Sequence, residues 1–413
     1  MVRTAIALCI AALLCTGVPA AARAGGPTTE NVTITGAGGV QLACEFVLPA
    51  GTAPDGGWPG LVLFPGLGAV PPIDGDSFAT AGFASVSCAE RGTGSSGGAF
   101  DLAGPNDAKD AQAIFDWLAA RPEVSDTEIG AEGWELGGAE VWNAAAAGVP
   151  FKAIVPADTW SSLHWALEPT GVLNVSLFNL LSGEGPTTWN TSSGIAARSH
   201  RGSLHSLTVP TLIVGERSFF FFDLSQATAA YRLLAGPKRL DIGWNADRLA
   251  DVVAWLQHYL AGGPKIGGGV EIQHEQPDTA TTKYVKLPPS RAVTVNLPGS
   301  ALTRSVWLPG GPLETFGRGS VTIRYSGASW RQVVATVSTA DGKEVTEGAA
   351  AVKGRAGVLT IPLLNEMRLL PRGQKLTVTL SSHDSTFGGA AGGTIAVGRM
   401  TLRLSVLARA VSH

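Results

Sequence analysis

The six residues from Gly133 to Gly138 (GWELGG) have the spacing of a sharp turn that presents a nucleophile between a strand and a helix. The central residue of such a turn is held in a strained conformation, and its neighbours must be small so that strand and helix can approach closely. Gly133, Gly137 and Gly138 meet that need, and the central residue is Glu135. The turn therefore predicts nucleophilic chemistry, and the side chain at the nucleophile position is a carboxylate.

The elements around this turn alternate between strands and helices, which is typical of a mostly parallel sheet covered on both faces. A strand over 129–133 and a helix over 138–147 flank Glu135. Residues 158–209 interrupt the alternation, and we predict that they form a lid inserted between two strands. The other expected elements are extended segments within 32–48, strands over 61–64, 84–88, 153–156, 211–214 and 240–242, and helices over 107–120, 224–234 and 247–260.

The two ends of the chain differ from this α/β domain, which we place at 25–262. Residues 1–24 carry Arg3, an apolar stretch and an Ala-x-Ala site ending at Ala24, which is typical of a signal peptide and predicts a secreted, extracytoplasmic protein. A Gly-rich linker is expected over 263–282. Beyond it the apolar pattern has period two, so 283–413 should form an all-β sandwich or jelly roll, with a hairpin turn at Asp341-Gly342.

Four motifs resemble those of the α/β-hydrolases, and in particular of the X-prolyl dipeptidyl peptidase and cocaine esterase family of serine hydrolases. They are 91–98 (RGTGSSGG), the end of a helix at 116–122 (DWLAARP), the turn at Glu135, and 210–215 (PTLIVG) before the loop that holds the family's acid. The resemblance implies a hydrolase domain with a lid, a C-terminal jelly-roll-like domain, and cleavage of esters or peptides by a Ser-His-Asp triad.

The family's catalytic residues do not recur at the positions that the resemblance assigns to them. The nucleophile position holds Glu135, the acid position holds Ser218 with Asp223 nearby, and the histidine position falls near Asn245. Since a serine hydrolase needs a hydroxyl, a base within hydrogen-bond reach and an acid that orients the base, we predict that the triad has been replaced. Two alternatives stay open: Glu135 as the nucleophile, or relocated residues such as Asp158 with a lid histidine.

The surroundings of the turn give further expectations. The N–H groups of Leu67 and Leu136 would form an oxyanion hole, or else be ordinary turn amides. We predict that Glu135 either pairs with these donors or is buried with a raised pKa. Asp158 stands where some α/β-hydrolases place the acid, with a helix N-cap as its alternative role. The phenylalanine run 219–222 predicts an apolar site beside the lid.

Composition limits the partners. Of the 413 residues 45% are hydrophobic and 15% charged, and the net charge of −3 provides no cationic field for nucleic acid. The seven histidines form no zinc motif and the GxGxxG run at 92–97 opens no helix, so we predict no metal and no cofactor. After residue 24 no segment is long enough to span a membrane. Cys44 and Cys88 are expected to form a disulfide or to be buried free thiols.

The leading functional hypothesis is an exported α/β-hydrolase homologue that binds a small-molecule, ester or peptide ligand in an apolar, lid-covered pocket without efficient turnover. The alternative is an active serine-type acyl or peptide hydrolase, resembling an esterase or X-Pro dipeptidyl peptidase, with relocated catalytic residues. A third hypothesis is carbohydrate binding by Trp307 and Trp330 of the β-domain. The sequence gives no indication of the oligomeric state.

Overall fold

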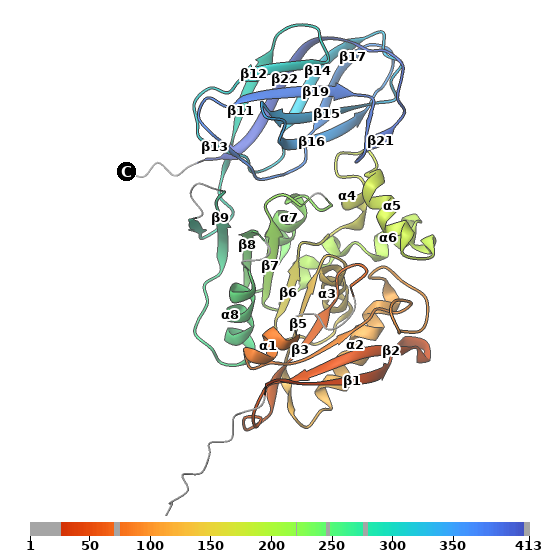
Figure 1. Cartoon of the computed structure of the whole chain (residues 1–413), viewed down its shortest axis with the longest axis vertical. Coiled ribbons are helices and arrows are strands. Elements are labelled where there is room, and N and C mark those ends of the chain that lie inside the picture. The colour runs from red at the N-terminus through yellow and green to blue at the C-terminus, as the bar shows by residue number, and fades with distance from the viewer. Residues whose placement is uncertain (1–25, 70–74, 220, 245–247, 276–279, 409–413) are drawn as a thin grey trace, which may run out of the picture.

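A computed structural model of the chain describes residues 26–69, 75–219, 221–244, 248–275 and 280–408. The predicted signal peptide and Asn245 lie outside these ranges. An α/β domain occupies one end of the longest axis and an all-β domain the other, with the lid helices on the side of the sheet that faces the β-domain (Figure 1). The predicted fold class is confirmed.

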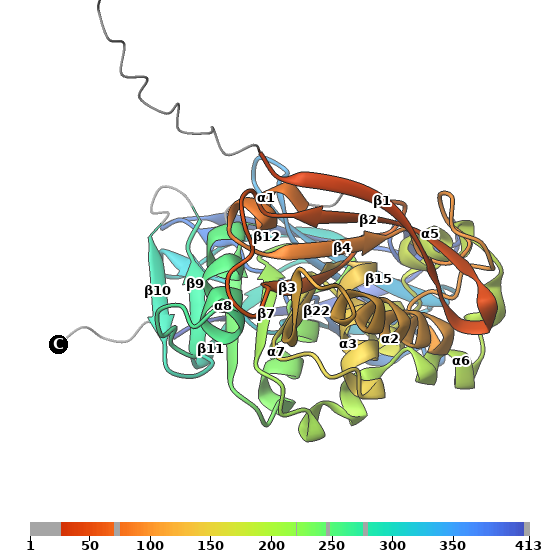
Figure 2. The same ribbon diagram turned by 90° about the horizontal axis from the view of Figure 1, so that it is seen from below.

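A ten-stranded sheet forms the centre of the α/β domain, in the order β1-β2-β4-β3-β5-β6-β7-β8-β9-β10. The strands from β4 to β9 run parallel, and β1, β2 and β10 are antiparallel to their neighbours. Figure 2 shows β1 and β2 at one edge and β9 and β10 at the other. The bounds are β1 (Thr28–Thr35), β2 (Gln41–Leu48), β3 (Trp58–Phe64), β4 (Ala84–Cys88), β5 (Val124–Trp134), β6 (Ile154–Ala157), β7 (Thr211–Glu216), β8 (Lys238–Gly243), β9 (Gly269–Gln273) and β10 (Thr281–Tyr284).

Helices cover both faces because the central strands are apolar on both. Successive residues of β3 point to opposite faces: Leu63 shares a buried cluster with Trp255 of α8, and Phe64 shares another with Trp142 of α3. The bounds are α1 (Gly75–Thr80), α2 (Pro105–Ala119), α3 (Leu136–Ala147), α7 (Ser225–Leu233) and α8 (Leu249–Leu260).

The segment predicted as a lid joins β6 to β7 and contains three short helices, α4 (Leu163–Leu167), α5 (Val175–Gly183) and α6 (Ser192–Ala197). Each helix starts at a polar N-cap whose side chain accepts a backbone hydrogen bond. These caps are Ser162, Asn174 and Thr191. Leu163, Leu177 and Trp189 bury their side chains in one apolar cluster with Leu136, so the lid packs directly on the start of α3.

The predicted linker over 263–282 is wrong, because two strands of the main sheet, β9 and β10, overlap it. β9 pairs with β8, and its Val270 and Ile272 are fully buried. β10 pairs with β9, so the strand predicted to open the β-domain at Lys283 belongs to the α/β domain. The glycine run at 267–269 marks the start of β9, and the two apolar residues that follow are too few to show a strand pattern.

The β-domain is a sandwich of two four-stranded antiparallel sheets, β11-β22-β14-β17 and β12-β19-β15-β16, around one apolar core. The predicted Asp341-Gly342 turn leads from β15 into β16, a strand that the sequence pattern does not predict. The bounds are β11 (Ser290–Leu297), β12 (Thr303–Trp307), β13 (Leu313–Glu314), β14 (Ser320–Ser326), β15 (Gln332–Thr339), β16 (Glu344–Ala351), β17 (Gly357–Pro362), β18 (Leu369–Leu370), β19 (Lys375–Ser381), β20 (His383–Asp384), β21 (Gly388–Gly389) and β22 (Ala396–Leu407).

Cys44 of β2 and Cys88 of β4 stand directly opposite each other in the antiparallel register. The structure joins them in a disulfide, and both are buried. This bond fastens the antiparallel hairpin β1–β2 to the parallel part of the sheet.

Candidate functional site

Glu135 stands at the apex of the turn between β5 and α3, with a φ of 52° and a ψ of −111°. A positive φ is strained for a residue with a side chain. A Cβ on Gly137 would lie 2.0 Å from the carbonyl oxygen of Phe64, and one on Gly133 would lie 2.4 Å from Gly137. The glycines therefore allow strand and helix to meet at van der Waals distance, and the turn holds Glu135 in the strained geometry that the sequence predicts.

The Glu135 carboxyl group lies against the turn that follows β3. A Cβ on Gly66 would be 3.4 Å from Glu135 Oε2 and 2.9 Å from the Trp134 ring. Leu67 is half-buried in this turn, and Leu136 is fully buried as the first residue of α3. In the described ranges no hydrogen bond joins the carboxyl group to either predicted oxyanion donor. Glu135 is half-buried rather than buried. Burial, and secondly the charge of Glu216, raise the pKa of Glu135 to about 7, so of the second predicted state only the raised pKa is present.

The raised pKa makes stability depend on pH. An acid whose pKa is higher in the folded chain stabilises the fold fully below its unfolded pKa of about 4.5, and that contribution is lost as the pH rises toward 7. Glu135→Gln cannot ionise, so we expect a smaller loss of stability between pH 5 and pH 8 than in the wild type. Urea unfolding at both pH values measures this, with Glu168→Gln on the exposed lid surface as control. An identical pH dependence in Glu135→Gln and wild type would contradict it.

Asp158 directly follows β6, is 4% exposed and has a φ of 43°. Its carboxyl oxygens accept hydrogen bonds from the Glu216 N–H and, at 3.2 Å, from Trp134 Nε1. Burial raises the pKa of Asp158 to about 7, with the charges of Glu216 and Glu135 adding to the effect and the two hydrogen bonds opposing it. Asp158 does not serve as the N-cap of the following helix, because Ser162 caps α4.

Glu216, which the sequence analysis missed, completes a set of three carboxyl groups. It is the last residue of β7, and burial raises its pKa, opposed by the charge of Arg368. Glu135, Asp158 and Glu216 thus stand at the carboxyl ends of three neighbouring strands, β5, β6 and β7. Glu216 follows a buried apolar strand, and functional groups of parallel sheets commonly lie at the carboxyl ends of such strands. This position is the sequence signal that could have identified Glu216.

Ser218, at the predicted acid position, contacts the other domain. Its hydroxyl donates a hydrogen bond to Glu366 Oε2 at 3.0 Å. Burial raises the pKa of Glu366 to about 7. Asp223, the nearby candidate, accepts the N–H of Asn365 and pairs with Arg318 at 3.3 Å. Both residues of the acid loop are therefore held by the β-domain, which no pattern within the loop predicts.

The structure brings no histidine to the three carboxyl groups within its described ranges. His258, late in α8, contacts the Gly263 carbonyl instead. Of the lid histidines, His164 and His205 are exposed and His200 is 6% exposed with an unpartnered Nε2. Burial, and secondly the Arg198 charge, lower the pKa of His200 to about 4, so this imidazole is neutral at pH 7.

A cluster of aromatic rings extends from Trp134, the neighbour of Glu135, to the lid. Phe219 lies 6.3 Å from the Trp134 ring, 5.8 Å from Phe221 and 5.7 Å from Phe222, between ring centroids. Phe222 also lies 5.3 Å from Trp160 of the lid. Phe220 is outside the described residues. The phenylalanine run thus forms an apolar layer. The carboxyl groups with raised pKa values lie at the edge of this layer.

One group of three carboxylates is spaced closely enough to hold a metal ion, but arginine side chains pair with these carboxylates. Asp241, Asp251 and Glu271 each bring an oxygen within 4.8 Å of the others. Arg239 contacts all three carboxylates, with 2.7 Å to Asp241 and 3.2 Å to Asp251, and Arg248 adds a second guanidinium group. The positive charge that a metal would supply is therefore already present.

Solved structures share this architecture over nearly the whole chain. A CocE/NonD family hydrolase from Staphylococcus aureus is 13% identical, with a TM-score of 0.68 and 92% of both chains covered. An aminopeptidase from a marine sediment Thaumarchaeota archaeon is 14% identical, with a TM-score of 0.70 over 92% of this chain and 97% of that one. An alpha-amino acid ester hydrolase is 13% identical, with a TM-score of 0.64 over 94% and 97%. The fold is that of an α/β-hydrolase.

The sequence comparison agrees for the first part of the chain. Residues 29–206 match the family model of the X-Pro dipeptidyl-peptidase (S15 family). No curated protein matches the sequence. The resemblance to the S15 and CocE-like hydrolases is confirmed. In the described ranges no helix has the length and apolar character needed to cross a membrane.

Proposed function

We propose that the protein is an exported α/β-hydrolase homologue that binds an apolar acyl or peptidyl small molecule at the Glu135 turn without serine-type turnover. The observation that carries the proposal is the carboxyl group of Glu135 at the apex of an intact strained turn. A carboxylate there, with no base beside it in the described ranges, cannot run the acyl transfer that a hydroxyl and an imidazole perform. The Cys44–Cys88 disulfide supports export to an oxidising compartment.

The lining of the site supports a ligand that is apolar and carries a hydrogen-bond donor. The phenylalanine layer and Trp134 offer ring faces, while Glu135 and Glu216 offer carboxyl oxygens at its border. A donor or an ammonium group placed between these carboxyl groups would lower their raised pKa values.

Labelling with a fluorophosphonate tests the proposal, with intact mass and peptide mapping as the readout. We expect no stoichiometric adduct, and no turnover of simple acyl esters above that of the Glu135→Ala variant, while an active S15-family enzyme is labelled in parallel. A stoichiometric adduct on any serine would overturn the proposal and identify the nucleophile.

A second candidate is an active serine-type acyl or peptide hydrolase with relocated residues, and one contact favours it. Ser218 donates to Glu366, a carboxyl group whose pKa of about 7 suits a general base at neutral pH. On this hypothesis the adduct maps to Ser218, and both Ser218→Ala and Glu366→Gln abolish labelling and ester turnover. Labelling that survives both substitutions would remove it.

A further inference from the structure

The lid and the acid loop, residues 217–224, form two sides of the apolar cluster beside Glu135. Phe222 of the acid loop and Trp160 of the lid are both buried in this cluster, with 5.3 Å between their ring centroids. Leu136, the neighbour of Glu135, is buried in the same cluster. The shape of the proposed ligand site therefore depends on how the lid and the acid loop are held relative to each other.

The acid loop is fastened at both ends to one segment of the β-domain, which lies between β17 and β18. At the first end, the N–H of Met367 donates to the Arg217 carbonyl at 2.8 Å. At the other end, the N–H of Leu224 donates to the Asn365 carbonyl at 3.1 Å. Met367 is fully buried in an apolar cluster with residues of the α/β domain. The backbone of the β-domain thus determines where the acid loop begins and ends.

The β-domain also holds the lid, at the start of α5. The carbonyl of Thr386, in the turn between β20 and β21, accepts the N–H of Val175 at 2.7 Å and that of Ser176 at 3.2 Å. The Ser176 hydroxyl donates to the Ser385 carbonyl at 2.8 Å. The first two residues of α5 are therefore bonded to the β-domain.

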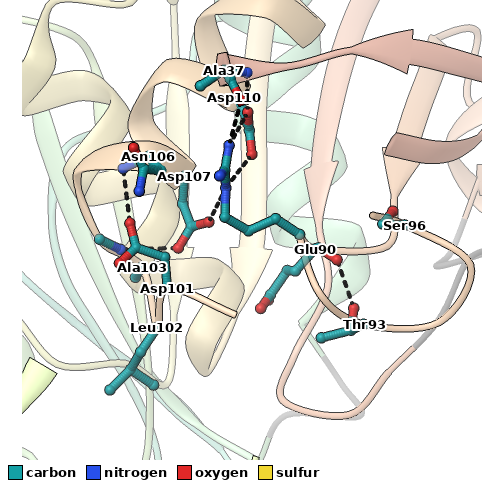
Figure 3. A network of polar contacts seen from close by, with 12 residues as sticks. Ala37, Glu90, Thr93, Ser96, Asp101, Leu102, Ala103, Asn106, Asp107 and Asp110 are labelled. Atoms are coloured by element: carbon teal, nitrogen blue, oxygen red, sulfur yellow. Dashed lines mark hydrogen bonds and ion pairs between the residues drawn. The ribbon is translucent and has the colours of Figure 1, made fainter. Parts of the chain in front are cut away.

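A later part of the lid is anchored within the α/β domain. Arg198 is 4% exposed, and its Nη2 donates to Asp101 Oδ1 at 2.7 Å. Asp101 in turn accepts the N–H of Asn106, in the first turn of α2, at 2.8 Å (Figure 3). Because this part of the lid is fixed to its own domain, the contacts with the β-domain determine the position of the remaining part, between α4 and α5.

One guanidinium group joins the lid, the acid loop and the β-domain. Arg318 precedes β14 in the β-domain, and its Nη1 donates to the Pro169 carbonyl in the lid. Its Nη2 donates to Asp223 Oδ2 of the acid loop at 3.3 Å and to Ser225 Oγ at 2.9 Å. Asp223 is 8% exposed, and it also accepts the N–H of Ser225, the first residue of α7, at 2.9 Å and that of Asn365 at 3.1 Å. The side chain of Arg318 therefore lies where these three parts of the chain meet.

We propose that Arg318 is a positioning residue of the ligand site, which holds the lid and the acid loop at a fixed separation across the apolar cluster. This inference rests on the proposed function, because it concerns the same site. The planar guanidinium group presents five N–H donors in a fixed geometry, so it can bind acceptors on two elements at once. Arg318 acts through Pro169 and Asp223, which makes the β-domain a part of the ligand-binding unit.

Amide hydrogen exchange of Arg318→Gln tests the positioning directly. We expect exchange about tenfold faster than in the wild type in two peptides, one from the lid around Pro169 and one from the acid loop around Asp223, because each loses a charge-assisted contact. Arg372→Gln, at an exposed position of the same domain, is expected to exchange like the wild type. Unchanged exchange in both peptides of Arg318→Gln would overturn the proposal.

Binding of N-phenyl-1-naphthylamine, an apolar fluorophore with one N–H donor, shows whether this separation matters for the site. Measured well below the melting temperature, Kd is expected to rise about tenfold in Arg318→Gln and in Asp223→Asn, and no further in the double variant, because both substitutions weaken the same contact. A contact that only adds stability would lower the melting temperature and leave Kd unchanged, and that result would also overturn the proposal.

Failure of the proposed function gives a different result. Wild-type protein that binds the fluorophore no better than Glu135→Ala would contradict a ligand site at Glu135. Faster exchange in both peptides of Arg318→Gln would in that case still show that Arg318 positions the lid and the acid loop.

Discussion

Replacement of both cysteines by alanine is expected to lower the free energy of unfolding by about 4 kcal/mol, since the Cys44–Cys88 bond closes a loop with a sequence separation of 44 residues. The main effect is on the unfolded chain, which gains conformational freedom when the bond is absent. Urea unfolding of Cys44→Ala/Cys88→Ala, compared with the wild type, measures it.

The control is wild-type protein unfolded in the presence of a reductant, which should show the same loss. Equal stability of the double variant and the oxidised wild type would contradict the prediction and indicate that the two cysteines are free thiols in the native protein.

Arg217→Met is expected to cost about 3–5 kcal/mol, the usual loss when one partner of a buried ion pair is removed. Arg217 follows β7 and is 0% exposed. It donates to Glu314 Oε1 of the β-domain at 2.6 Å and to the Gln273 carbonyl at 2.6 Å. Without it, Glu314 would stay buried with only His274 beside it, at 2.6 Å. Because Ser218 is the next residue, we also expect its contact with Glu366 to loosen.

A double-mutant cycle separates the charge effect from general disruption. Arg217→Met combined with Glu314→Gln is expected to be more stable than Arg217→Met alone, because no uncompensated charge remains. Strictly additive losses would show that the two residues are not coupled across the domain contact.

Most elements of the α/β domain could be predicted because they have strong patterns of their own, whereas β9 and β10 lack one. β4 was predicted over the residues that form it, and the elbow at Glu135 follows from three glycines of fixed spacing. β16 was missed because its sequence, Glu344–Ala351, is rich in alanine and glycine, which have low strand propensity. Close packing requires a small residue in this strand, because a Cβ on Gly348 would lie only 1.9 Å from the Pro362 carbonyl oxygen.

The candidate site could be predicted only where one segment defines it. Glu135 and Asp158 were found from their place next to strands. The Ser218–Glu366 contact joins residues 148 positions apart, and Glu90 and Glu140 line one cavity only once β4 and α3 have packed. Nothing in a single sequence indicates that a particular pair of distant carboxyl groups will share one buried space. The charges are visible in the sequence, but their burial depends on tertiary packing.

The two strands after α8 also change which part of the sheet faces solvent. Without them β8 would be the last strand of the sheet, and its backbone N–H and C=O groups on that side would be unpaired. The edge would also carry Leu240 and Ile242, which are fully buried in the intact chain. Such an apolar, unpaired edge can pair with strands of other chains. β10 is instead four residues long, alternates exposed and half-buried positions and carries Lys283, so it is a poor template for further pairing. An α/β domain cut at residue 262 would therefore self-associate, and its natural boundary for separate expression lies after Tyr284.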